Sequence, residues 1–255
     1  MTLKLFQLNI FKGKFLPAVI DYIKTNDFDV VTLQEVTGGE YSFSGADCFL
    51  EIVKATGYLG EKTVAMIKKN DPGTYFSNTT FYKSNFNLLH AESIWMKAPQ
   101  KVNSIKDVTP IDMSRSALAL EFNFSGQKLT IVNTHMAWNM SPLDTPEKER
   151  QAQALLHYVE KISTPFVLAG DFNLTPETNI IKTFNKLGRN LVTEHIITNT
   201  LNPHTHKVKE LFPKGLAVDY IFLSKELTVK NFKLVDSPDL SDHFGLEVDV
   251  ELQNN

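Results

Sequence analysis

The hydrophobic and polar positions of the chain fall into many short apolar runs, which predict more strands than helices. From Leu246 to Leu252 apolar side chains alternate with acidic ones, as in a strand with one buried face. The short, mostly apolar run at residues 30–33 is instead typical of a strand buried on both faces. Strands are predicted over residues 3–10, 30–33, 75–83, 88–95, 116–124, 129–134, 166–169, 217–223, 229–235 and 246–252, with a hairpin turn at residues 125–127.

A few longer segments have the spacing or the end signals of helices. Thr145 is the expected N-cap of the longest helix, with Pro146 at its first position. Gly57 and Gly188 are expected to end two of the others. Helices are predicted over residues 15–25, 47–56, 146–162 and 177–187. Because the strands outnumber the helices and do not alternate strictly with them, we expect two packed sheets with helices outside.

The composition is that of an ordinary globular protein and narrows the function by exclusion. The 255 residues carry a net charge of -3, and arginine occurs only at Arg115, Arg150 and Arg189. This balance does not predict a protein that grips long stretches of duplex nucleic acid. The single cysteine, Cys48, excludes an intrachain disulfide and fits a reducing compartment. Since no signal peptide pattern and no membrane-spanning run is found, we expect a cytoplasmic protein without membrane insertion.

Polar residues gather where the predicted strands end, which is where a scaffold tends to display functional groups. Taken singly, most have an ordinary interpretation: Asn9 and Asn173 as turn residues, or His135 as a partly buried, hydrogen-bonded histidine. Asp219 differs because it lies inside an apolar run, where an ionised carboxylate is costly without a partner. We favour His243 as that partner.

Taken together, these clusters supply carboxylates, carboxamides and two histidines, without a thiolate cluster. Hard cations prefer carboxylate, carbonyl and water oxygens. The same residue types suit phosphate hydrolysis, in which the protein orients a water and stabilises developing charge. The sequence therefore predicts a divalent-metal site that acts on a phosphate ester, with Mg²⁺ as the expected ion and Mn²⁺ as an alternative.

The order and spacing of the clusters resemble the motifs of the endonuclease/exonuclease/phosphatase superfamily, which has the deoxyribonuclease-I-like fold. The matching segments are Leu33-Gln34-Glu35-Val36, Asn133-Thr134-His135, Gly170-Asp171-Phe172-Asn173, Val218-Asp219-Tyr220-Ile221-Phe222 and Ser241-Asp242-His243. The resemblance implies an α/β (α+β) fold: a four-layer α/β sandwich of two packed mixed β-sheets flanked by helices. It also implies one such domain over residues 1–255.

The resemblance assigns roles around the metal and the attacking water. Glu35 resembles the metal-binding glutamate, Asn9 the asparagine beside the metal, and Asp242 the acidic residue that completes or flanks the site. Asp171 resembles the carboxylate that orients or deprotonates the water. Asn173 resembles the amide that steadies the phosphate.

Further roles concern the phosphate and the leaving group. Asp219 and His243 resemble a carboxylate–imidazole pair in which the charged imidazole stabilises the pentacovalent phosphate. His135 matches a histidine of the deoxyribonuclease and sphingomyelinase branches. Arg115 resembles a phosphate contact of some members, although a solvated arginine beside a strand is an equally good interpretation. Asn78 keeps the asparagine of a family strand motif whose small apolar step is absent here.

The sequence does not identify the substrate. A phosphodiester, in DNA or RNA among others, is the leading interpretation, and a phosphatase of a small metabolite or inositol phosphate is the alternative. An inactive binding scaffold is least favoured because the matched residues are present. We expect a monomer. Trp95, Trp138 and Phe244 are either aromatic flanks of the site or core, while His204 and His206 are interpreted as surface residues, not metal ligands.

Overall fold

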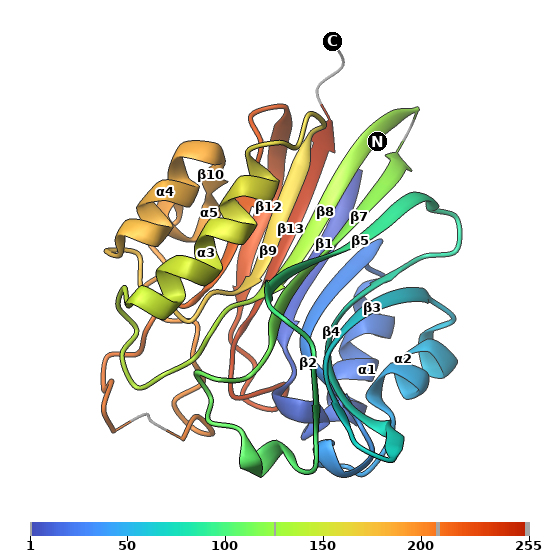
Figure 1. Ribbon diagram of the computed structural model, residues 1–255. Coiled ribbons are helices and arrows are strands. Elements are labelled where there is room, and N and C mark those ends of the chain that lie inside the picture. The colour runs from blue at the N-terminus through green and yellow to red at the C-terminus, as the bar shows by residue number, and fades with distance from the viewer. Residues whose placement is uncertain (1, 125, 208–209, 253–255) are drawn as a thin grey trace.

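Two β-sheets pack face to face between layers of helices (Figure 1). The computed structural model describes residues 2–124, 126–207 and 210–252, so Ser125 of the predicted hairpin turn lies outside the described residues. One sheet has the strand order β12-β13-β1-β2-β4-β3-β6 and the other the order β10-β11-β9-β8-β7-β5. Both contain parallel and antiparallel neighbours. The predicted sandwich of two mixed sheets flanked by helices is confirmed.

The strands are β1 (Thr2–Asn9), β2 (Val30–Gly38), β3 (Leu59–Lys68), β4 (Asp71–Tyr82), β5 (Asn87–Lys97), β6 (Gln100–Val102), β7 (Arg115–Phe124), β8 (Gln127–His135), β9 (Phe166–Asp171), β10 (Arg189–Asn190), β11 (Asp219–Leu223), β12 (Leu227–Val235) and β13 (Gly245–Leu252). The helices are α1 (Leu16–Asn26), α2 (Cys48–Thr56), α3 (Pro146–Val159), α4 (Asn179–Leu187) and α5 (Leu191–Glu194), with 3-10 turns η1 (Phe11–Gly13), η2 (Gly39–Tyr41) and η3 (Ile105–Asp107).

The alternation of side chains along β1 explains why helices cover both outer faces. Leu3 and Leu5 point into the core between the two sheets. Phe6 and Leu8 point the other way, into a second core formed with α1 and α2. On the opposite side of the sandwich, α3 and α4 pack on the second sheet (Figure 1). Among the described residues, no helix is long and apolar enough to cross a membrane.

The structure differs from the predicted elements where local signals compete. Strand β2 continues to Gly38, beyond the predicted end, through a bulge between Leu33 and Val36. Helix α4 begins at Asn179 because Thr178 caps it by accepting from the Ile181 amide. Strands β3, β6 and β10 were not predicted. Strand β3 carries partly exposed side chains at most positions, which weakens its apolar signal.

Gly170 allows β8 and β9 to approach beside the site, because its φ is +149° and a Cβ there would lie 2.0 Å from the Thr134 carbonyl oxygen. We expect Gly170→Ala to lower the free energy of unfolding by at least about 2 kcal/mol, combining backbone strain with overpacking. Gly73→Ala is the control, since its Cβ would meet only Asp71 Oδ1 at 3.5 Å. Urea unfolding of both variants measures the difference, and equal stabilities would contradict the prediction.

Candidate active site

The functional side chains come from strand ends that meet at one edge of the two sheets, at the bottom of Figure 1. His135 and Asp171 are register partners at the ends of the parallel strands β8 and β9. Asp219 opens β11 directly opposite Asp171. Asn9 ends β1 beside Gln34 of β2. Positions far apart in the sequence are thus brought together because parallel strands end, and antiparallel ones begin, at the same edge.

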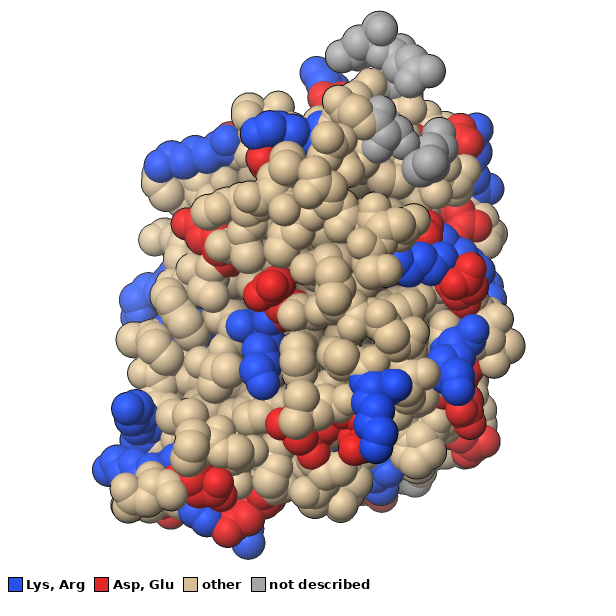
Figure 2. All heavy atoms as spheres, turned by 90° about the vertical axis from the view of Figure 1, so that its right-hand side faces the viewer, with Lys and Arg blue, Asp and Glu red and all other residues tan. Residues whose placement is uncertain are grey.

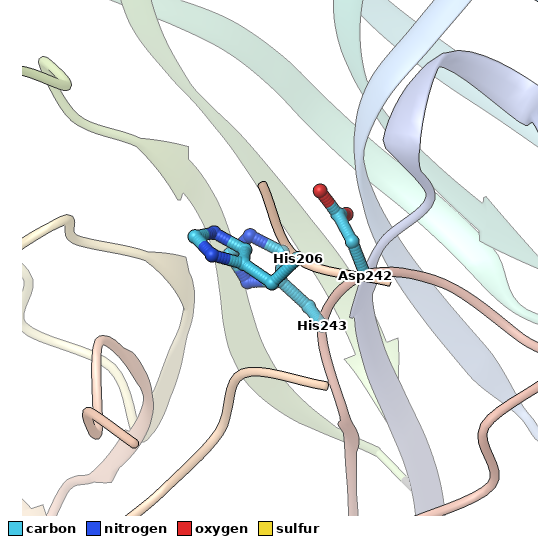
Figure 3. Close-up of side chains that lie close together, drawn as sticks. All are labelled: His206, Asp242 and His243. Carbon is cyan, nitrogen blue, oxygen red and sulfur yellow. The ribbon is translucent and has the colours of Figure 1, made fainter. Parts of the chain in front are cut away.

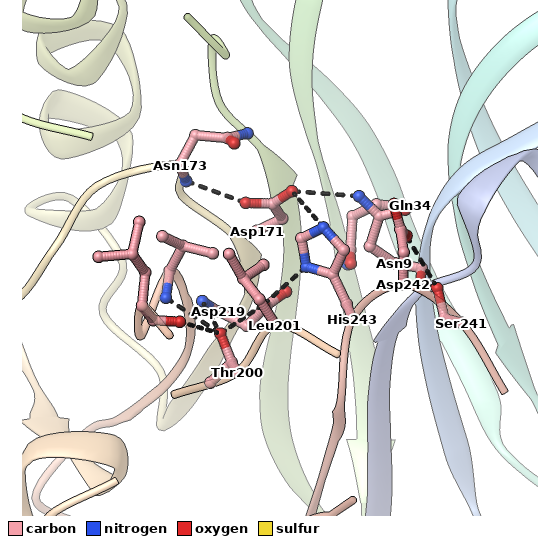
Figure 4. Close-up of polar contacts among 12 residues, drawn as sticks. Asn9, Gln34, Asp171, Asn173, Thr200, Leu201, Asp219, Ser241, Asp242 and His243 are labelled. Atoms are coloured by element: carbon pink, nitrogen blue, oxygen red, sulfur yellow. Dashed lines mark hydrogen bonds and ion pairs between the residues drawn. The ribbon is translucent and has the colours of Figure 1, made fainter. Parts of the chain in front are cut away.

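Asp171 is the centre of the polar network (Figure 4). Asn9 Nδ2 donates to its Oδ2 at 3.1 Å, and the backbone amide of Asn173 donates to its Oδ1 at 2.9 Å. The Nε2 atoms of His135 and His243 lie 3.5 and 3.9 Å from Oδ2. Burial raises the pKa of Asp171 to about 7, although the charge of His243 opposes this effect. A carboxylate with a pKa near neutrality is suited to accept a proton from water.

Asp219 and His243 make the predicted contact. Nδ1 of His243 lies 2.9 Å from Asp219 Oδ2, and the same oxygen accepts from Thr200 Oγ1 at 2.7 Å. Burial alone would lower the pKa of His243, but the Asp219 carboxylate and its hydrogen bond raise it well above the ordinary value. The imidazole is therefore held in its charged form, with Nε2 facing Asp171.

A chain of buried side-chain amides is hydrogen-bonded to Asp219 of this pair. These amides were not among the predicted site residues. Gln7 Nε2 donates to Asp219 Oδ1 at 3.2 Å and to Gln34 Oε1 at 2.9 Å. Gln34 in turn donates to Asn133 at 2.7 Å, and Asn133 donates to backbone carbonyls of β2 and β4. The available signal was Gln7 itself, a polar residue on the inward face of an otherwise apolar strand.

Glu35 sits at the bulge of β2 with a left-handed backbone (φ 57°). Its Oε2 is buried and has no hydrogen-bond partner among the described residues. Asp242 lines the same cleft. Burial and the negative charge of Glu35 raise its pKa to about 6. Ser241 links this corner to β1 by donating to the Asn9 carbonyl at 2.5 Å. Crowded carboxylates with an unsatisfied oxygen fit a bound divalent cation.

Among the described residues, two other groups of side chains are close enough to hold a metal: His206, Asp242 and His243 (Figure 3), and Asp171, Asp219 and His243. His243 belongs to both, but its Nδ1 is engaged by Asp219 and its charged form is favoured. A protonated imidazole is not a metal ligand. Asn9, Glu35 and Asp242 instead offer oxygen atoms, which are the donors that a hard cation prefers. His206 is partly buried and lines the cleft, so its interpretation as a surface residue was wrong.

The guanidinium group of Arg115 lies in the same cleft. Its side chain is 3% exposed, and Nε and Nη1 have no hydrogen-bond partner among the described residues. Burial lowers the pKa of Arg115, but a guanidinium stays charged in proteins. His135 beside it is kept neutral, because burial and then the charge of Arg115 lower its pKa. The site thus offers a charged and a neutral donor to an anion.

Asn173 also has a left-handed backbone (φ 53°), which turns the chain back over Asp171. Its side-chain amide donates to the Met136 carbonyl at 3.1 Å. Lys148 of α3 holds the Asn173 carbonyl at 2.9 Å and the Ser141 carbonyl at 2.6 Å. Burial lowers the pKa of Lys148 to about 8. This lysine could not be identified from the sequence, because nothing in a helical charge pattern distinguishes it from a solvated one.

The other predicted residues lie as follows. Asn78 is buried in β4 and donates to the Ser116 carbonyl at 2.7 Å, and it is not among the residues that line the cleft. Trp138 does line the cleft, whereas Trp95 lies on β5 and Phe244 lines a separate groove. Of the predicted site residues, the cleft brings together Asn9, Glu35, Arg115, His135, Asp171, Asn173, Asp242 and His243.

The cleft has a volume of about 360 Å³, and residues within the ranges 104–114, 136–144, 201–207 and 210–216 contribute to its lining. Lys12 and Lys207 add positive charge to the lining. On the face drawn in Figure 2, basic and acidic side chains are intermixed and neither sign forms a continuous patch. A space of this volume accepts a small molecule or one unit of a polymer.

The chain belongs to a known family. The model of the Endonuclease/Exonuclease/phosphatase family matches residues 6–243, and the members of this family are phosphoester hydrolases that depend on a divalent metal. The CCR4-Not complex 3'-5'-exoribonuclease subunit Ccr4 of Candida albicans is 24% identical over 184 residues, which cover 62% of this chain and 23% of that protein. The matched segment covers less than a quarter of the length of the Ccr4 subunits to which this chain is similar.

Solved structures share the fold over nearly the whole chain. The human nocturnin catalytic domain, solved with a bound sulfate anion, has a TM-score of 0.71 at 20% identity and covers 99% of this chain and 94% of its own. The mannosyl-6-phosphatase of Bacteroides thetaiotaomicron has a TM-score of 0.68 at 17% identity and covers 98% and 100%. At these identities the likeness shows the fold alone.

Proposed function

We propose that this protein is a Mg²⁺-dependent phosphodiesterase in which a water activated by Asp171 attacks phosphorus. One observation carries the proposal: the cleft contains both an unpaired carboxylate oxygen, on Glu35, and two unpaired nitrogens of a buried guanidinium, Nε and Nη1 of Arg115. Each is costly to leave unsatisfied. A metal cation together with a phosphate anion satisfies both at once, which no single charged ligand does.

The side chains then divide the reaction among them. Asp171 accepts the proton of the attacking water, since its oxygens are oriented by Asn9 and by the Asn173 amide. Arg115 binds a non-bridging phosphate oxygen, and the charged His243 stabilises the charge that develops in the transition state. Neutral His135 would assist the leaving oxygen.

Asn9, Glu35 and Asp242 would hold the metal, which, when bound, neutralises phosphate charge and polarises the phosphoryl group. Oxygen-only ligation favours Mg²⁺ or Mn²⁺ over softer ions. Ser241 positions this set by bonding both the Asn9 carbonyl and Asp242 Oδ1.

We expect Glu35→Gln to raise the Mg²⁺ concentration for half-maximal activity by about 10- to 100-fold, because a neutral amide replaces a charged ligand. Mg²⁺ titration of the hydrolysis rate measures the shift, and binding of Mn²⁺ followed by electron paramagnetic resonance measures affinity without turnover. Glu51→Gln, on the exposed first turn of α2, is the control. An unchanged metal requirement in Glu35→Gln would remove Glu35 from the metal site.

A substrate panel tests the proposed activity. Wild type with Mg²⁺, with Mn²⁺ or with EDTA is assayed on single-stranded and plasmid DNA, RNA, a 5'-tyrosyl oligonucleotide, inositol phosphates, sugar phosphates and bis(4-nitrophenyl) phosphate. Metal-dependent cleavage of phosphodiesters supports the proposal, and the exoribonuclease relative makes RNA a strong candidate. Cleavage of monoesters alone would favour the alternative, a phosphatase of small metabolites, which the limited cleft volume also suits. No cleavage of any substrate would refute both.

A further inference from the structure

Much of the cleft lining takes no part in the chemistry described above. Phe11, Met113, Trp138, Met140 and Phe212 all line the same cleft as Asp171 and Arg115. These side chains are contributed by separate loops of the chain. An apolar wall that adjoins a set of charged groups is the usual composition of a site for a small organic ligand.

Phe11 and Met113 of this apolar wall are buried, but other parts of it are not covered by the protein itself. Met140 is 56% exposed, and Trp138 is only partly buried. Large apolar side chains left open to water beside a charged site gain free energy when a ligand covers them. The wall therefore favours an apolar or aromatic group in the cleft.

The loop that carries Trp138 and Met140 is hydrogen-bonded to the end of β9 and to the loop that follows it. The Met136 amide donates to the Asp171 carbonyl at 2.9 Å, and the Thr175 amide donates to the Pro142 carbonyl at 3.0 Å. Lys148 joins Ser141 of this loop to Asn173 through its two hydrogen bonds. Trp138 is thus presented at a set position next to the residues around the phosphate, which lowers the ordering cost of binding.

The charges in the cleft decide how a substrate lies in it. The phosphate belongs beside Arg115 and the carboxylates, so the group attached to it extends along the rest of the lining, which is mostly apolar but also contains Lys12 and Lys207. We propose that Trp138 and Met140, with Met113 facing the same cleft, form a subsite for one planar aromatic group attached to the phosphate ester. This inference rests on the proposed function and restricts its substrates to phosphodiesters that carry such a group.

Two esters with the same leaving group test the subsite: phenyl 4-nitrophenyl phosphate and methyl 4-nitrophenyl phosphate, each with Mg²⁺. We expect wild type to prefer the phenyl ester by about tenfold or more in kcat/KM, and Trp138→Ala to abolish most of this preference through KM. Trp138→Phe should restore part of it. Trp95→Ala, which removes a tryptophan outside the cleft, should leave the ratio unchanged. Equal kcat/KM for the two esters in wild type, or an unchanged ratio in Trp138→Ala, would overturn the subsite.

Binding without turnover separates this inference from the proposed function. In Trp95→Phe, Trp138 is the sole tryptophan, and phenyl phosphate should quench its fluorescence at concentrations at least about tenfold below methyl phosphate. If neither 4-nitrophenyl diester is hydrolysed but phenyl phosphate quenches at the lower concentration, the phosphodiesterase proposal fails and the subsite stands. Equal quenching by the two ligands would overturn the subsite whatever the activity. Met140→Ala provides a second variant if Trp138→Ala does not fold.

Discussion

Replacing Asp171 by asparagine is expected to lower kcat by about 10³- to 10⁴-fold while the protein stays folded, because an amide cannot accept the proton of the attacking water. The substitution keeps the size of the side chain. It also keeps an oxygen to accept from either Asn9 or the Asn173 amide, which now hold the carboxylate at 3.1 and 2.9 Å. Burial disfavours the carboxylate charge, so its removal should leave the melting temperature unchanged or raised.

The rate is measured as single-turnover hydrolysis of bis(4-nitrophenyl) phosphate at saturating Mg²⁺, beside thermal unfolding of the same samples. Asp21→Asn, at an exposed position of α1, is the matched control and should keep the wild-type rate. A folded Asp171→Asn protein with more than a tenth of the wild-type rate would exclude Asp171 as the base.

The Asp219–His243 pair is expected to behave as one unit. His243→Ala should lower kcat by about 10²- to 10³-fold through loss of transition-state charge, and Asp219→Asn by a similar factor, since His243 then loses the partner that keeps it charged. The double variant should be little worse than the poorer single one, because each substitution removes the same interaction.

A double-mutant cycle in kcat, with circular dichroism of every variant, measures this coupling. The control is a cycle between His243→Ala and His90→Ala, which combines the pair with an exposed histidine on β5 and should be additive. Additive effects of Asp219→Asn and His243→Ala would show that the hydrogen bond at 2.9 Å has no part in catalysis.

The sheets could be predicted from the sequence because their strands are apolar over most of their length. The period-two pattern of β13 and the apolar run of β9 identify strands without any tertiary information. Strand β3 escaped prediction because partly exposed, polar positions interrupt it, and it is stabilised by its neighbours β4 and β6. The continuation of β2 escaped because a bulge is not encoded by apolar periodicity.

The site could be predicted in part for a different reason. Asp219 stands out because a charge inside an apolar run demands a partner, and that partner is present. Lys148, Thr200 and His206 could not be found in this way, since their contacts arise only when the loops pack against the strand ends. The same holds for the bond of Asn78 to the Ser116 carbonyl, which depends on a contact between the two sheets.

We propose that this cleft uses a metal and a water activated by Asp171 to break a phosphate ester. Single-turnover hydrolysis of bis(4-nitrophenyl) phosphate in ¹⁸O-labelled water, with Mg²⁺ or with EDTA, tests it most directly. We expect one ¹⁸O atom in the released 4-nitrophenyl phosphate, none in the 4-nitrophenol, and no reaction with EDTA. Unlabelled phosphate product, label in the phenol, or full activity with EDTA would contradict it.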